Sequence, residues 1–271
     1  MTQHLIDHPS LWVERLGRFG YASKGVVYAI VGLLAAQVAF GTGGKTTDTK
    51  GALRTLVEQP FGQILLALVA IGLIGYVVWR FVEAIKDPEN KGNDIKGLAQ
   101  RISYAVNGFI YAGLAYSAVR ILLGSSSNSN SDSTEDWTAR ILSQPFGQWL
   151  VGTGGALIIG FGFYQFYRAY STKFQKQLNL TQLSHKERRW VIGICRFGLV
   201  ARGIVFCITG WFFIQAATQY NAQAVGGLDQ ALQMLAQQPY GPWLLGFVAL
   251  GLIAYGIYMV IKARYSQLVV N

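Results

Sequence analysis

Charged residues are scarce in this sequence. Only 13% of the 271 residues are Asp, Glu, Lys or Arg, and 52% are hydrophobic, whereas a soluble domain usually carries about 25% charged residues. Three long segments, residues 61–79, 146–167 and 239–261, contain no charged residue. Uncharged apolar runs of about 18 residues or more match the hydrocarbon thickness of a bilayer. The scarcity of charge excludes an ordinary soluble domain and predicts a protein that spans a membrane.

The residues that commonly build catalytic or metal sites are also scarce. The histidines, His4, His8 and His185, lie outside the predicted spans, and no carboxylate falls in the middle of a span; Glu83 lies at the end of one. Proton relays and cation-coupled carriers usually need an acid inside the membrane. No Ser/His/Asp set, phosphate loop or dinucleotide fingerprint is present. We therefore expect no catalytic residue, no metal, no cofactor and no enzymatic activity.

The sequence contains three copies of one pattern. The segment Arg18–Tyr28 is repeated as Arg101–Tyr111 and as Arg196–Phe206. Each copy is followed by the same turn, which is Gln59-Pro60-Phe61-Gly62, then Gln144-Pro145-Phe146-Gly147, then Gln238-Pro239-Tyr240-Gly241. Each turn opens a long apolar run, so each copy is predicted to be a pair of apolar helices.

The predicted fold is an all-α membrane bundle of six transmembrane helices in three tandem units, covering residues 11–88, 94–172 and 186–266. Two spans return the chain to the same side, so the three units share one orientation about a pseudo-threefold axis along the membrane normal. A short amphipathic stretch precedes each Gln-Pro turn and is predicted to lie on the membrane surface as a helix. These stretches are residues 51–58, 136–143 and 228–235.

The net charge of +10 is distributed unevenly. Most of the 23 lysines and arginines lie in the N-terminal segment, the two connections between units and the C-terminal tail, which share one side. The positive-inside tendency then places both termini in the cytoplasm of a cell (inner or plasma) membrane. Topology and attraction to anionic lipid headgroups explain the basic excess, and no basic-aromatic module favours nucleic acid as a partner.

Small residues recur at helical spacing on the first helix of each unit. They are Ala22, Gly25, Ala29 and Gly32; Ala105, Gly108, Ala112 and Ala115; and Val200, Gly203, Cys207 and Gly210. Such stripes let membrane helices pack closely; a substrate groove is the alternative interpretation. Aromatic pairs on the second helices, such as Tyr76 with Trp79 and Tyr255 with Tyr258, are interpreted as belts at the membrane interface.

Three helix pairs that open with Arg-x-x-x-x-x-(Lys/Asn/Arg)-Gly and turn on Gln-Pro-(Phe/Tyr)-Gly resemble the bacterial membrane family called domain of unknown function 1206. The resemblance covers about Leu16 to Arg264 and implies a multi-pass protein of three such pairs. It carries no catalytic or cofactor site over to this chain. The second unit departs from the pattern, with Asn107 where the others have Lys24 and Arg202.

Six polar residues form the candidate site. Lys24, Asn107 and Arg202 lie about 9 Å further along their helices than Arg18, Arg101 and Arg196. Threefold packing would arrange them as two stacked polar rings near the cytoplasmic face, where an anion or an acidic lipid headgroup would bind. Alternatively, the long side chains extend to the headgroups and only fix the depth of the helices.

Two functions are compatible with these patterns. The favoured one is a non-catalytic scaffold or accessory subunit that binds a membrane-protein or cytoplasmic partner. The alternative is a channel or carrier for a small anionic solute. Mitochondrial solute carriers also use three helix pairs, but their Pro-x-(Asp/Glu)-x-x-(Lys/Arg) signature is missing here, and fold analogy alone is weak support.

Overall fold

The computed structural model describes residues 8–87, 92, 94–124, 132–171, 174–175, 178, 180 and 183–265. This part of the chain is all-α, as predicted. Its α-helices are α1 (His8–Ala39), α2 (Thr49–Val57), α3 (Gly62–Lys86), α4 (Ile95–Leu122), α5 (Asp132–Leu142), α6 (Gly147–Ser171), α7 (His185–Gln219), α8 (Leu228–Ala236) and α9 (Gly241–Tyr265), with a short 3₁₀ helix, η2 (Ala222–Ala224), between α7 and α8.

Six of these helices, α1, α3, α4, α6, α7 and α9, are long and apolar enough to cross a membrane. The expected number of spans is therefore confirmed. The short helices α2, α5 and α8 each lie between the two spans of one unit, where the amphipathic stretches predicted them. Asp48 directly precedes α2, and its carboxylate accepts a hydrogen bond of 2.7 Å from the Gly51 N–H and so caps the helix.

The repeated Gln-Pro-(Phe/Tyr)-Gly sequence forms a tight turn between each short helix and the following span. In the first turn the Gly62 N–H donates to the Gln59 carbonyl at 2.7 Å, and Phe61 adopts a left-handed conformation with φ of 60°. A Cβ on Gly62 would lie only 2.4 Å from the Leu56 carbonyl oxygen. Only glycine allows the chain to reverse so closely, which explains why the glycine of this turn recurs in all three units.

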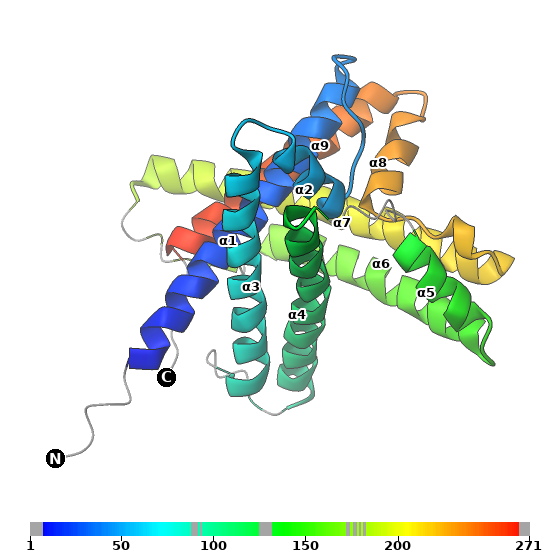
Figure 1. Cartoon of the computed structure of the whole chain (residues 1–271), viewed down its shortest axis with the longest axis horizontal. Helices are drawn as coiled ribbons and strands as arrows, with labels where there is room; N and C mark the ends of the chain where they lie inside the picture. The colour runs from blue at the N-terminus through cyan, green and yellow to red at the C-terminus, as the bar shows by residue number, and fades with distance from the viewer. Residues whose placement is uncertain are drawn as a thin grey trace.

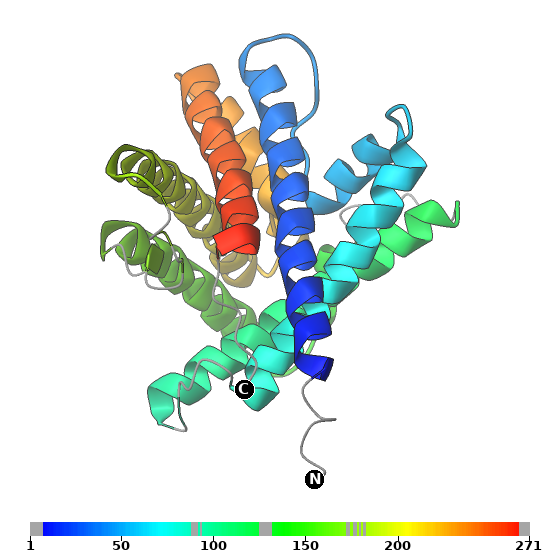
Figure 2. The same ribbon diagram turned by 90° about the vertical axis from the view of Figure 1, so that its left-hand side faces the viewer.

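The six spans follow one another around the bundle in the order α1, α3, α4, α6, α7, α9. Neighbours in this order pack together, as do α9 and α1, with one exception: within the described residues, α4 and α6 make no extensive contact. Figure 1 shows α3 and α4 side by side and upright, whereas α6 and α7 run across the view. In Figure 2, α1 and α9 (blue and red) lie together at the centre, between these two pairs. The two spans of the second unit, α4 and α6, are therefore separated from each other, and we call the space between them the opening.

A difference in residue size accounts for this opening. A Cβ on Gly20 would lie 2.5 Å from the Tyr76 backbone nitrogen, and one on Gly198 would lie 2.5 Å from that of Tyr255. These two glycines let α1 approach α3 and α7 approach α9. Ser103 occupies the equivalent position on α4, and its side chain fills the space that such an approach needs. The two helices of the second unit cannot pack in the same way.

Glycines also bring the units together, as the small-residue stripes predicted. A Cβ on Gly25 of α1 would lie 2.7 Å from the Gly256 carbonyl oxygen of α9. Helix α7 meets α6 in the same manner, because a Cβ on Gly203 would lie 3.0 Å from the Gly162 oxygen. Such backbone contacts drive association where lipid provides no hydrophobic force. Gly160 of α6, by contrast, faces open space.

Candidate functional site

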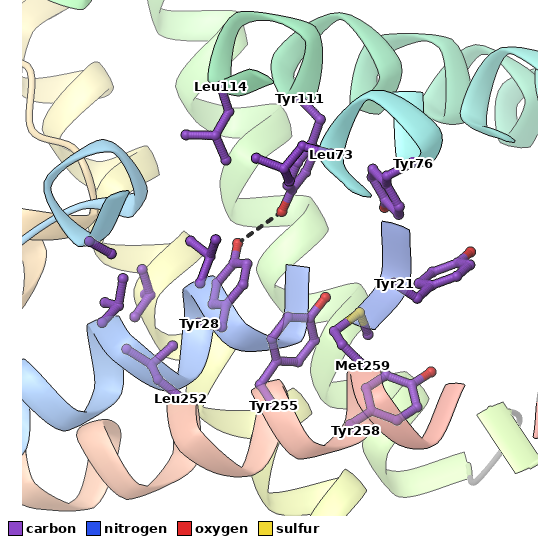
Figure 3. Packing of buried hydrophobic residues seen from close by; sticks show 14 of the residues in the cluster. Tyr21, Tyr28, Leu73, Tyr76, Tyr111, Leu114, Leu252, Tyr255, Tyr258 and Met259 are labelled. Carbon is purple, nitrogen blue, oxygen red and sulfur yellow. Dashed lines mark hydrogen bonds between the residues drawn. The ribbon is translucent and has the colours of Figure 1, made fainter. Parts of the chain in front are cut away.

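Cationic side chains and tyrosines gather where α1, α3, α4, α7 and α9 meet. We call this group the cation–tyrosine cluster; it consists of Lys24, Arg80, Arg202 and Lys262, the carboxylate of Glu83, and the tyrosines Tyr21, Tyr28, Tyr76, Tyr111, Tyr255 and Tyr258. Figure 3 shows the hydroxyls of Tyr28, Tyr111 and Tyr255 directed into one region between the helices. All six tyrosines are buried.

Lys24 extends from α1 into the cluster and is only 2% exposed. Its Nζ donates a hydrogen bond of 3.0 Å to the Tyr76 hydroxyl on α3. The same ammonium lies 4.7 Å from the centre of the Tyr76 ring and 4.2 Å from that of Tyr111 on α4. The aromatic faces therefore stabilise the charge by cation–π attraction, which strengthens when the cation is desolvated.

Arg202 of α7 occupies the equivalent position in the third unit and makes the equivalent contact. Its guanidinium donates to the hydroxyl of Tyr255 on α9 and lies 4.6 Å from the centre of that ring. Tyr255 follows its Gln-Pro turn at the same distance as Tyr76 follows the first. The Tyr28 ring of α1 also faces Arg202 at 5.6 Å. A cation–tyrosine pair thus recurs in the first and third units.

Arg80 and Glu83 on α3 form a buried ion pair, with an N–O distance of 2.6 Å. The Arg80 guanidinium also donates to the Tyr21 hydroxyl at 2.8 Å. The Lys262 Nζ lies 4.5 Å from the centre of the Tyr21 ring. The tyrosine therefore contacts one cation from α3 and one from α9.

The cluster carries excess positive charge. Its four cationic side chains, together with Arg168 of α6, which donates to the Tyr258 hydroxyl at 3.3 Å, face the one carboxylate of the cluster, Glu83. Arg202, Arg80 and Lys262 all repel Lys24. Removing charges from water costs several kcal/mol per ion unless partners compensate. Three buried N–H donors here, Trp79 Nε1, Arg80 Nε and Arg202 Nε, have no hydrogen-bond acceptor among the described residues. The arrangement suits a ligand that brings negative charge and acceptor oxygens.

Comparisons with known proteins agree with the repeated architecture. The family model described as Domain of Unknown Function (DUF1206) matches residues 19–87, 102–172 and 197–266. The chain belongs to this family. A Bacillus subtilis (strain 168) relative named "Uncharacterized protein YxxB" is 39% identical over 257 residues, which cover 95% of this chain and 92% of the relative. No solved structure matches.

In this DUF1206 protein, the six residues of the two predicted polar rings lie in different surroundings. Of the inner set, Lys24 and Arg202 enter the cluster, whereas Asn107 donates to the Ser103 carbonyl of its own helix at 3.1 Å. The outer arginines engage separate partners. Arg18 pairs with Glu14 at 2.7 Å, Arg101 donates to the Ala84 and Ile85 carbonyls at the end of α3, and Arg196 is exposed.

The interfacial-belt interpretation of Tyr76, Trp79, Tyr255 and Tyr258 is wrong. All four are buried, with exposures of 2% or less, and the hydroxyls of the three tyrosines accept hydrogen bonds from cationic side chains of neighbouring helices. Sequence reasoning also missed Arg80, Glu83 and Lys262. Comparing the second helices position by position provides the missing signal: Arg80 aligns with Gln165 and Met259, and Glu83 aligns with Arg168 and Lys262. Positions that face lipid are apolar, so charged residues at these aligned positions indicate that the positions face the interior of the bundle.

Proposed function

We propose that this multi-pass membrane protein binds an anion inside its helix bundle, as a channel or carrier for a small anionic solute would. The excess positive charge of the cation–tyrosine cluster carries the proposal. Guanidinium groups such as those of Arg80 and Arg202 match the geometry of carboxylate and phosphate oxygens. A bound anion would offset the repulsion between Lys24 and Arg202 that the protein otherwise retains.

A non-catalytic scaffold or accessory subunit with a membrane-protein partner is the second candidate. The backbone-close packing of α1 on α9 and of α6 on α7, through Gly25, Gly256, Gly162 and Gly203, favours a rigid body of that kind. We further propose that the protein is not an enzyme and does not bind nucleic acid. The location of most lysines and arginines at one end of the spans supports a cell-membrane orientation with both termini in the cytoplasm.

Inorganic phosphate is a suitable probe of anion binding. We expect phosphate to raise the melting temperature of the purified protein, at an ionic strength held constant with sodium gluconate, because a ligand of the folded state stabilises it. Lys24→Ala with Arg202→Ala should abolish the shift. The matched control is Lys186→Ala with Arg189→Ala, which removes two exposed positive charges and should leave it intact. An equal shift in both double variants would refute the proposal.

Uptake of labelled phosphate into proteoliposomes then separates the two candidates. A carrier or channel should move phosphate through the wild-type protein and the control variant, but not through the Lys24/Arg202 variant. Binding without uptake would favour the scaffold, with the anion as a structural ligand.

A further inference from the structure

The second unit differs from the others at the positions that build the cation–tyrosine pairs. It has Asn107 in place of the cation, and Phe161 where the others have Tyr76 and Tyr255. Phe161 has no hydroxyl and packs edge-on against Phe206 of α7, with ring centres 5.1 Å apart. With Ser103 also in place of glycine, nothing in this unit draws α6 toward α4. The opening between them is therefore encoded in the sequence.

The cluster borders this opening on both sides. On the α4 side, the Tyr111 hydroxyl donates to that of Tyr28 at 3.4 Å, and the Arg80 guanidinium lies 5.2 Å from the Tyr104 ring centre. On the α6 side, the Arg202 guanidinium is only partly buried and lies 4.9 Å from the ring centre of Phe206, the side chain that packs against Phe161 of α6.

The outward surfaces of the same two helices are apolar. Ile102, Val106 and Phe109 of α4 are 50% or more exposed, as are Leu157 and Phe163 of α6. A fully hydrated anion gains nothing from crossing such a surface, whereas the acyl chains of a lipid remain in contact with it. The route between α4 and α6 is thus apolar and ends at the cation–tyrosine cluster. Such a route matches an amphipathic anion.

We infer that the anion bound at Lys24 and Arg202 is the phosphate of an acidic phospholipid, which reaches the cluster sideways from the bilayer between α4 and α6. The inference rests on the proposed anion binding and names its ligand class. The headgroup meets the ammonium and guanidinium groups, and the acyl chains lie along α4 and α6. The protein is thereby suited to extract or present an acidic lipid.

The first experiment closes the opening without adding charge. Ser103→Gly with Phe161→Tyr gives the second unit the residues that hold the other two together. Native mass spectrometry of protein reconstituted in mixed phosphatidylglycerol and phosphatidylcholine vesicles then measures the retained lipid. We expect wild type to retain phosphatidylglycerol preferentially, and the closing variant to retain about tenfold less. The Lys24→Ala, Arg202→Ala variant should also lose it.

This experiment distinguishes a failure of lipid entry between α4 and α6 from a failure of the proposed anion binding. The closing variant should keep the melting shift produced by inorganic phosphate, because Lys24 and Arg202 are unchanged. Lipid retention equal to that of wild type, or loss of the phosphate shift together with the lipid, would overturn sideways entry. A phosphate shift in wild type without preferential lipid retention would leave anion binding standing and remove the lipid.

A second experiment needs no variant. Phosphatidylglycerol with a photoreactive acyl chain should label peptides covering residues 102–110 of α4 and 157–164 of α6 in the wild-type protein. Excess unlabelled phosphatidylglycerol should suppress that labelling, and phosphatidylcholine should not. Even labelling of all six spans, or equal competition by both lipids, would contradict the inference.

Discussion

The ammonium of Lys24 lies 3.0 Å from the hydroxyl of Tyr76, and the third unit repeats this contact between Arg202 and Tyr255. A buried charged donor that loses its acceptor costs about 1–3 kcal/mol or more. We therefore expect Tyr76→Phe and Tyr255→Phe each to lower the free energy of unfolding by about that amount. Unfolding in mixed micelles measures the change. Tyr116→Phe, at a side chain 65% exposed, is the control and should have little effect.

The Arg80–Glu83 pair should matter much more than the Arg18–Glu14 pair, although both join residues on one helix. Glu83→Gln leaves the Arg80 charge buried without its carboxylate, which typically costs about 3–5 kcal/mol. Glu14→Gln removes a pair whose side chains are 40% and 26% exposed, for which water screening predicts less than about 1 kcal/mol. Equal losses of unfolding free energy in the two variants would show that the first pair is solvated.

Replacement of glycine by alanine should distinguish glycines that contact another helix from glycines that face open space. A Cβ on Gly256 would lie 2.6 Å from the Gly25 carbonyl oxygen, so Gly256→Ala forces α1 and α9 apart and should destabilise by about 1–3 kcal/mol. Gly160→Ala meets nothing within 4 Å and should be neutral or stabilising, since alanine favours the helix by up to about 1 kcal/mol. Melting temperatures in one detergent compare them. The reverse order would contradict the α1–α9 contact.

Asp48 links the stability of α2 to pH. Partial burial raises the pKa of its carboxyl, against the opposing hydrogen bond from the Gly51 N–H. The folded state therefore takes up a proton before the unfolded state does, and the free energy of unfolding should rise as the pH falls through this raised pKa. Asp48→Asn keeps the cap and should remove that rise, whereas Asp48→Ala should lose about 1 kcal/mol at neutral pH. Melting curves recorded from neutral pH into the acid range provide the measurement. A variant with the pH profile of wild type would assign the change to another group.

The sequence by itself determined the number of spans, the short helices before each turn and the identity of the repeats. These features are local. An uncharged run within a bilayer must satisfy its backbone hydrogen bonds internally and therefore forms a helix, and the Gln-Pro turn needs its glycine wherever it occurs. Lys24 and Arg202 were also found in this way, because the repeats align them.

Only the tertiary structure decided which polar residues meet. Lys24 finds its acceptor 52 positions away on another helix, whereas Arg18, on the same helix, pairs locally with Glu14. Whether a tyrosine faces lipid or the core depends on the cation opposite it, which helical periodicity does not reveal. The separation of α4 from α6 likewise depends on how closely two backbones approach, and the effect of Ser103, Asn107 and Phe161 on that approach is visible only once the helices are packed.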